Sequence, residues 1–147
     1  MEIARTAKGI LVIQRKYTLD LVKDIGIIDC KHAATPVEPN SNFCLEENSA
    51  PMEKARYQRI VGRLIYLSYT RLDIAFVVSL VSQFMHSPRE SHLVAVNRIL
   101  QYLKSTSRKG LYFDKGEKKR NVATFVDADW AGNVIDRKST TSYCTKV

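Results

Sequence analysis

Two short apolar runs near the start of the chain are separated by a polar turn that ends in glycine. The runs span residues 2–5 and 10–14, and Gly9 closes the turn between them. This arrangement is typical of a β-hairpin. From residue 17 to residue 25, apolar side chains instead recur every fourth position, which predicts a helix that ends at Gly26.

Three further helices are predicted in the middle of the chain, each from helical spacing of apolar residues. The first spans residues 53–69. The second spans residues 73–85 and begins with Asp73 as a cap; because it is apolar nearly all round, we expect it to be the buried helix. The third starts at a predicted capping box, with Ser87 as N-cap, proline at the first helical position and Glu90 at N3.

After these helices the periodicity becomes that of strands, at residues 111–113, 122–127 and 139–146. Residues 31–53 hold three of the four prolines and are predicted to form a loop or linker. The predicted fold class is α+β, with an N-terminal β-hairpin and helix, a central three-helix segment and a C-terminal antiparallel sheet. The predicted domains are residues 1–50, 51–110 and 111–147.

The charge of the chain is unevenly distributed. Its 147 residues carry 23 Lys and Arg against 15 Asp and Glu, a formal net charge of +8. Residues 1–50 hold six basic and seven acidic residues, whereas residues 98–120 hold eight basic and two acidic ones. Such a local excess can neutralise phosphates and predicts weak, sequence-independent contact with nucleic acid; the alternative is a solvated face that keeps the chain in solution. The predicted contact residues are Arg98, Lys104, Arg108, Lys109, Lys118, Lys119 and Arg120.

Two carboxylates at the end of a predicted strand are the candidate metal ligands. Asp127 and Asp129 are two residues apart, so their positions share one face of the strand. Carboxylates gathered in this way could hold Mg²⁺ for phosphodiester chemistry, although a complete site needs more acids from other elements. The alternative is that both are ordinary turn or cap residues.

Cysteine use and hydropathy bear on the compartment. The three cysteines, at positions 30, 44 and 144, lack the paired spacing of a zinc site and favour free thiols. An odd, sparse set of cysteines predicts an intracellular protein rather than a disulfide framework. No apolar run approaches the roughly 20 residues that span a bilayer.

Several motifs, in order along nearly the whole chain, resemble the Pol polyprotein of copia-type LTR retrotransposons. They are Tyr57-x-x-x-Val61-Gly62-x-Leu64-x-Tyr66-Leu67, Thr70-Arg71-Leu72-Asp73-Ile74-Ala75, Pro88-x-x-x-His92, Arg98-Ile99-Leu100-x-Tyr102-Leu103-Lys104-x-Thr106 and Val126-Asp127-Ala128-Asp129-Trp130-Ala131-Gly132. The last motif is similar to the start of that family's RNase H domain, and the first 17 residues resemble the segment just after the polymerase palm. Leu72 stands where the family usually has proline.

The resemblance implies a fragment that runs from the end of a reverse transcriptase, through a helical thumb or connection segment, into an RNase H-like sheet. Such an enzyme acts on RNA, DNA and RNA–DNA hybrid with Mg²⁺, and Asp127 aligns with its first RNase H carboxylate in preference to Asp129. The polymerase's Tyr-x-Asp-Asp motif has no counterpart in this chain, and the later RNase H ligands are missing. We therefore expect a catalytically inactive fragment without bound metal, in the nucleus or cytoplasm.

Two alternatives to the inactive fragment stay open. One is a retained, non-enzymatic nucleic-acid-binding module. The other is a secreted RxLR-type effector, because some sequences that resemble this Pol segment carry that label. The absence of both a signal-peptide pattern and an Arg-x-Leu-Arg sequence argues against the effector.

Overall fold

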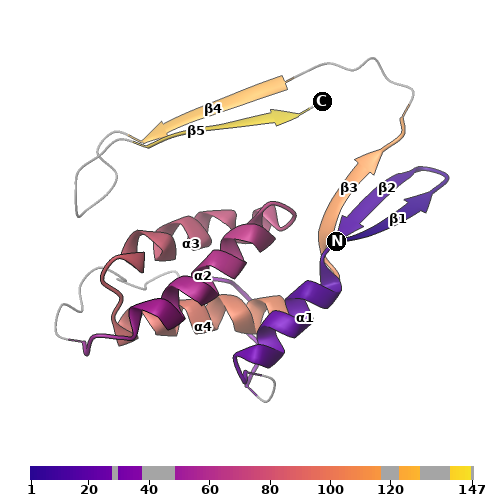
Figure 1. Cartoon of the computed structure of the whole chain (residues 1–147). Coiled ribbons are helices and arrows are strands. Elements are labelled where there is room, and N and C mark those ends of the chain that lie inside the picture. The colour runs from indigo at the N-terminus through magenta and orange to yellow at the C-terminus, as the bar shows by residue number, and fades with distance from the viewer. Residues whose placement is uncertain (28–29, 38–48, 117–122, 130–139, 147) are drawn as a thin grey trace. The chain divides into compact units, whose positions relative to one another are not determined.

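The structure is a computed structural model that divides into two units, Met1–Lys115 and Gly116–Val147 (Figure 1). It describes residues 1–27, 30–37, 49–116, 123–129 and 140–146, the last two ranges by their backbone. Helices and strands both occur in the first unit, so the predicted α+β fold class is confirmed.

The first unit contains a three-stranded antiparallel sheet in the order β1-β2-β3. Strands β1 (Glu2–Thr6) and β2 (Gly9–Ile13) form the predicted hairpin. Strand β3 (Gly110–Asp114) pairs with β2, so that Gly9 lies opposite Asp114 and Gly110 opposite Ile13. A side chain on either glycine would clash with a carbonyl oxygen of the facing strand. The two glycines are therefore required by the close approach of these strands.

Strand β3 pairs with the N-terminal hairpin, whereas its position in the sequence suggested a partner in the C-terminal segment. Residues 111–113 were predicted as a strand and grouped with the C-terminal segment, but β3 extends the N-terminal hairpin instead. A two-stranded hairpin is marginal alone, and a third strand adds the cross-strand pairs that stabilise it.

Four α-helices follow the predicted order. Helix α1 (Arg15–Asp24) ends as expected, because Gly26 adopts a positive φ of 77° and its N–H donates to the Lys23 carbonyl at 3.0 Å. The central helices are α2 (Lys54–Ser68), α3 (Leu72–Ser82) with a short 3₁₀ turn η1 (Gln83–Met85), and α4 (Glu90–Ser105).

The start of α4 corrects the predicted capping box. The helix begins at Glu90 rather than Pro88, and the N–H of the N-cap residue Arg89 donates to Nδ1 of His92 at 3.1 Å. The backbone just before the helix is hydrogen-bonded to residues 50–52. The Met52 N–H donates to the Pro88 carbonyl, and the Glu90 N–H donates to the Ala50 carbonyl. Residues paired in this extended bridge cannot also take helical geometry, so Ser87 does not cap the helix.

Helix α3, which the sequence predicts to be the buried helix, is buried on one face and exposed on the other. The buried side chains are Ile74, Val77, Val78 and Val81, whereas Phe76 is 72% exposed and Leu72 62% exposed. Asp73 is not the cap of the helix either. It lies in the first turn and pairs with Arg71, the residue that precedes the helix.

The core lies between α2, α3 and α4, with α1 packed against α4. At its centre Tyr57 of α2 is fully buried, and its hydroxyl donates to the Val81 carbonyl near the end of α3 at 2.8 Å. Burial raises the pKa of Tyr57 well above its ordinary value, so the phenol stays a neutral hydrogen-bond donor. No helix in the described residues combines the length and the apolarity needed to cross a bilayer.

In the second unit the described residues form one antiparallel strand pair. Strands β4 (Ala123–Asp129) and β5 (Thr140–Lys146) match the two strands predicted there. Asp127 lies opposite Ser142, and Asp129 opposite Thr140.

Replacing Tyr57 by phenylalanine should lower the free energy of unfolding by about 1–2 kcal/mol, because the Val81 carbonyl loses its buried donor. Urea unfolding at pH 7 measures the loss. The control is Tyr66→Phe on the same helix, whose parent side chain is 47% exposed and should tolerate the change within about 0.5 kcal/mol. Equal losses in the two variants would contradict the structural role of the Tyr57 hydroxyl.

Candidate functional site

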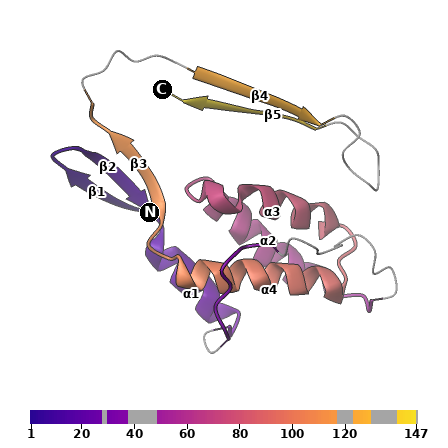
Figure 2. The ribbon, with the colours of Figure 1, turned by 180° about the vertical axis from the view of Figure 1, so that it is seen from behind.

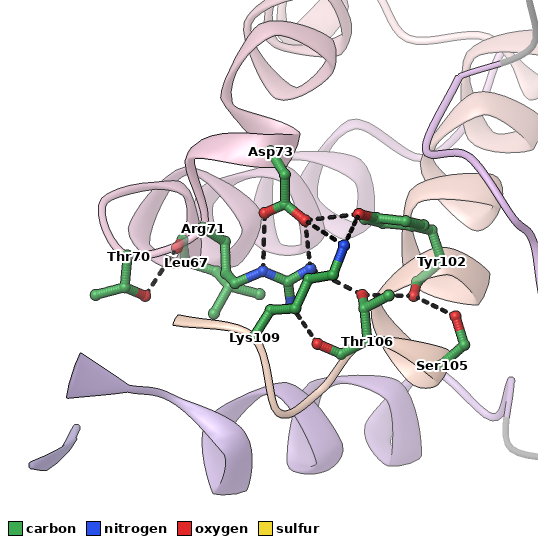
Figure 3. Close-up of polar contacts among 8 residues, drawn as sticks. All are labelled: Leu67, Thr70, Arg71, Asp73, Tyr102, Ser105, Thr106 and Lys109. Atoms are coloured by element: carbon green, nitrogen blue, oxygen red, sulfur yellow. Dashed lines mark hydrogen bonds and ion pairs between the residues drawn. The ribbon is translucent and has the colours of Figure 1, made fainter. Parts of the chain in front are cut away.

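The guanidinium of Arg71 is only 2% exposed and donates four hydrogen bonds (Figure 3). Its Nε and Nη2 donate to the two carboxylate oxygens of Asp73, at 2.9 and 2.8 Å. Its Nη1 donates to the Thr106 carbonyl just after α4 at 2.9 Å, and Nη2 also donates to the Thr106 hydroxyl at 2.8 Å. Arg71 thus joins the start of α3 to the end of α4.

Asp73 is surrounded by donors. Besides Arg71, the Tyr102 hydroxyl donates to its Oδ2 at 2.7 Å, and Nζ of Lys109 lies 4.0 Å from the same oxygen. Partial burial alone would raise the pKa of Asp73, but the hydrogen bonds from Arg71 and Tyr102 and the charges of Arg71 and Lys109 outweigh it, so the pKa falls below its ordinary value. Asp73 is therefore a stable carboxylate anion at neutral pH.

A pocket of about 270 Å³ lies beside this network, with Leu72, Asp73, Lys109 and Leu111 in its wall. Its charged groups are already paired with one another: Lys109 donates to the Tyr102 hydroxyl at 3.1 Å as well as facing Asp73. A general base needs a free, suitably basic group within reach of a substrate. Asp73, fully engaged and of lowered pKa, serves instead to hold two helices together.

The described members of the predicted basic set have separate partners. Nζ of Lys104 donates to the Cys30 carbonyl at 3.1 Å, and Nη2 of Arg98 donates to the Thr35 hydroxyl at 3.3 Å. These two cations hold the segment 30–37 across the outside of α4 (Figure 2). Lys109 belongs to the Asp73 network, and Arg108 is exposed. Whether these residues bind nucleic acid stays a prediction.

The remaining predicted contacts, Lys118, Lys119 and Arg120, lie outside the described residues. The candidate metal ligands lie on β4, where the structure gives their register. The β5 residues paired with Asp127 and Asp129 are Ser142 and Thr140, and the sequence of β5 contains no Asp or Glu. Two carboxylates are a smaller donor set than a two-metal site requires, and Mg²⁺ at this strand stays a prediction.

Elsewhere, the described side chains include no group of three or more His, Cys, Asp or Glu that could hold a metal ion. His92 instead stacks on Phe84, with ring centroids 3.8 Å apart, and accepts the Arg89 N–H on Nδ1. Burial and the nearby charge of Arg89 lower the pKa of His92, which keeps the ring neutral and able to accept this bond.

Sequence reasoning missed two features. One is the role of the Arg71–Asp73 pair. Arg71 donates to Thr106, which is 35 residues later in the chain, and Asp73 accepts from Tyr102, which is 29 residues later. The other is a cationic face on α2, where Arg56 and Arg59 are exposed. The signal for this face was present in the sequence, since α2 contains four basic residues and no acidic one.

Replacing Arg71 by methionine should lower the free energy of unfolding by about 1–3 kcal/mol, because the Thr106 carbonyl loses its donor and the partly exposed Asp73 carboxylate loses two hydrogen bonds. Thermal and urea unfolding measure this loss. The control is Arg59→Met, which removes an exposed guanidinium and should change stability by less than about 0.5 kcal/mol. A loss as small as the control's would show that the network does not support the fold.

The stability contributed by Asp73 should depend on pH. Because its pKa is lower in the folded than in the unfolded chain, the contribution is complete above the ordinary value near 3.8 and is lost as pH falls through the folded value. Asp73→Asn should therefore destabilise the protein at pH 7, and the difference from the parent chain should shrink between about pH 5 and pH 2. Urea unfolding at stepped pH tests this; a difference that is constant with pH would contradict it.

Comparison with known proteins places these features in context. No family model and no solved structure matches the chain. The chain is 39% identical, over 97% of its length, to a retrovirus-related Pol polyprotein from transposon RE1 of Arabidopsis thaliana, of which it covers 10%. It is 32% identical, over 95% of its length, to the corresponding polyprotein from transposon TNT 1-94 of Nicotiana tabacum, of which it covers 11%.

A shorter relative carries a different name. Over 65% of its length the chain is 40% identical to secreted RxLR effector protein 161 of Plasmopara viticola, and it covers 68% of that protein. The chain spans about a tenth of the two Pol polyproteins described above. Over nearly its whole length, the chain is thus a homologue of a segment of the retrovirus-related Pol polyproteins of transposons.

Proposed function

We propose that this chain is a non-catalytic, nucleic-acid-contacting segment of a retrotransposon Pol polyprotein, from the connection between its polymerase and RNase H parts. The observation that carries the proposal is the homology to transposon Pol over 97% of the chain, combined with the cationic excess of its second half. Fixed cations of this kind contact phosphates without reading sequence. The expected partners are RNA, DNA or an RNA–DNA hybrid, bound weakly.

The proposal that the chain is inactive by itself rests on its sequence. Metal-dependent phosphoryl transfer needs carboxylates that hold two ions near the reacting oxygens. No two aspartates are adjacent anywhere in the chain, so it lacks the paired motif of the polymerase. The RNase H-like part contributes Asp127 and Asp129, on one strand only.

What remains to the chain is positioning. The Arg71 network fixes α3 against α4, and the chain passes directly from that network through Arg108 and Lys109 into β3. A rigid helical body with exposed cations can follow a polyanionic backbone without any chemical step.

A second candidate is a secreted effector, favoured by the similarity to secreted RxLR effector protein 161. This chain has no Arg-x-Leu-Arg sequence. Expression of the tagged chain in its own cells distinguishes the two functions: recovery of the intact protein from the medium would favour the effector.

The salt dependence of binding tests the main proposal. A fluorescein-labelled RNA–DNA hybrid of 20 base pairs should bind with an affinity that falls as KCl rises, by the release of counterions. Replacing Lys118, Lys119 and Arg120 together by glutamine should flatten the slope of log K against log salt by about 2. The matched control is Lys8→Gln/Lys16→Gln/Lys23→Gln, which removes the same charge from the N-terminal part.

An unchanged slope in the first triple variant would contradict the role of residues 118–120. Primer extension, or cleavage of the hybrid, by the pure chain with Mg²⁺ would contradict its assignment as non-catalytic.

A further inference from the structure

Residues 30–37 lie across the outside of α4, and we call this segment the α4 strap (Figure 2). Ala33 is buried in the core, and Val37 packs against the same cluster. Nζ of Lys104 donates to the Cys30 carbonyl at 3.1 Å. The strap itself forms neither helix nor strand. A segment without the hydrogen bonds of regular secondary structure can open locally while the rest of the fold stays intact.

Thr35 is the exposed hydroxyl of the strap, and Pro36 follows it. Its Oγ1 donates to the Val37 carbonyl at 2.8 Å and accepts from Nη2 of Arg98 at 3.3 Å. A residue that precedes proline is restricted to extended backbone conformations. An exposed, extended threonine followed by proline is the acceptor that proline-directed protein kinases select.

The surroundings of Thr35 are cationic. The strap contains Lys31 and no acidic residue. Helix α4 contributes Arg98 and Lys104. Its single acidic residue, Glu90, precedes Arg98 by eight positions, or about 12 Å along the helix axis. A phosphate on Thr35 would therefore be placed among positive charges, where a phosphate orders the segment that carries it.

We propose that Thr35 is a phosphorylation site for a proline-directed protein kinase, and that Arg98 binds the phosphate and closes the strap on α4. The hydroxyl oxygen of Thr35 forms a bond to the γ-phosphorus of ATP. The bond from that phosphorus to the bridging oxygen breaks, ADP leaves, and the hydroxyl proton passes to the base of the kinase. The proposal does not depend on the proposed function.

Arg98 is the group that gives the phosphate its effect. At present its guanidinium makes a long bond to a neutral hydroxyl oxygen. A phosphate at the same position presents three acceptor oxygens and about two negative charges. Guanidinium–phosphate hydrogen bonds are shorter and stronger than neutral ones and are often bidentate. Phosphorylation thus converts one weak contact into an ion pair that ties the strap to α4.

The chain contains one other serine or threonine followed by proline, Ser87-Pro88, which serves as an internal comparison. Pro88 is buried, and its carbonyl accepts the Met52 N–H. The next residue, Arg89, is paired with Pro51 in a β-bridge. A kinase must take the acceptor segment into its own cleft, so Ser87 should be a poor acceptor although it is exposed.

Treatment of the full chain with a purified mitogen-activated or cyclin-dependent kinase and Mg-ATP tests the acceptor. Peptide mass spectrometry should show phosphate on Thr35 at least about tenfold faster than on Ser87, and Thr35→Ala should remove the faster event. Labelling of Thr35 that is absent, or no faster than that of Ser87, would overturn the proposal.

The melting temperature tests the role of Arg98. Phosphorylation should raise it by about 3–5 °C in the parent chain and by less than about 1 °C in Arg98→Gln. The matched control, Arg59→Gln, removes an exposed charge from α2 and should keep the full shift. Each shift compares two forms of one variant, so any loss of stability caused by the substitution itself cancels.

Arg98→Lys is the second variant, for the case that Arg98→Gln does not fold. It keeps the charge but lacks the paired N–H groups of the guanidinium, so about half of the shift should remain. Equal shifts in the parent chain and in the Arg98 variants would overturn the capture of the phosphate by Arg98.

Trypsin reports on the strap alone. Lys31 is exposed and is the only Lys or Arg between Lys23 and Lys54. Phosphorylation should slow cleavage after Lys31 about fivefold in the parent chain and leave its rate unchanged in Arg98→Gln. Cleavage after the exposed Lys8, in the β1–β2 turn, is the control and should not change. Cleavage after Lys31 that is equally fast with and without the phosphate would overturn the closure of the strap.

Discussion

The first unit depends on the burial of one guanidinium. Arg71 is almost completely buried, and a charged group in that position is tolerated only if its hydrogen bonds are satisfied. All three of its nitrogens donate, to Asp73 on α3 and to Thr106 after α4. The hydrogen bonds that satisfy this charge therefore fix the relative position of these two helices, and the chain leaves α4 for β3 close to the same point.

The network also changes the meaning of the Thr70-Arg71-Leu72-Asp73 motif. In the sequence of an enzyme, an Arg and an Asp this close together can indicate acid–base chemistry. Here Arg71 and Asp73 position two helices instead. A buried ion pair often adds little net stability compared with apolar packing, because desolvation offsets the attraction, whereas breaking it is costly. Its value lies in specifying one geometry. Leu72 is exposed at the first position of α3, and the ion pair between Arg71 and Asp73 on either side of it holds that turn in place.

Local patterns predicted the local elements well. The hairpin, the helices and the glycine that ends α1 all follow from periodicity and turn chemistry within about 20 residues. Features that depend on distant partners were not predictable in this way. Ser87 does not cap α4 because the backbone beside it is hydrogen-bonded to residues 50–52. Strand β3 pairs with a strand about 100 residues earlier. Arg71 and Thr106 come together only in the folded chain. Phe76 is exposed because the helices pack on one side of α3 only.

The same distinction applies to charge. A count along the sequence treats all cations alike, but folding assigns some of them to the chain itself. Arg98 and Lys104 hold a neighbouring segment, and Lys109 faces a carboxylate, so part of the charge between residues 98 and 120 is already used. Arg56 and Arg59 lie outside that stretch of the sequence. Both are exposed on helix α2, which contains no acidic residue. The affinity of a protein for a polyanion follows the cations that folding leaves available, so a count of charges along the sequence overstates it.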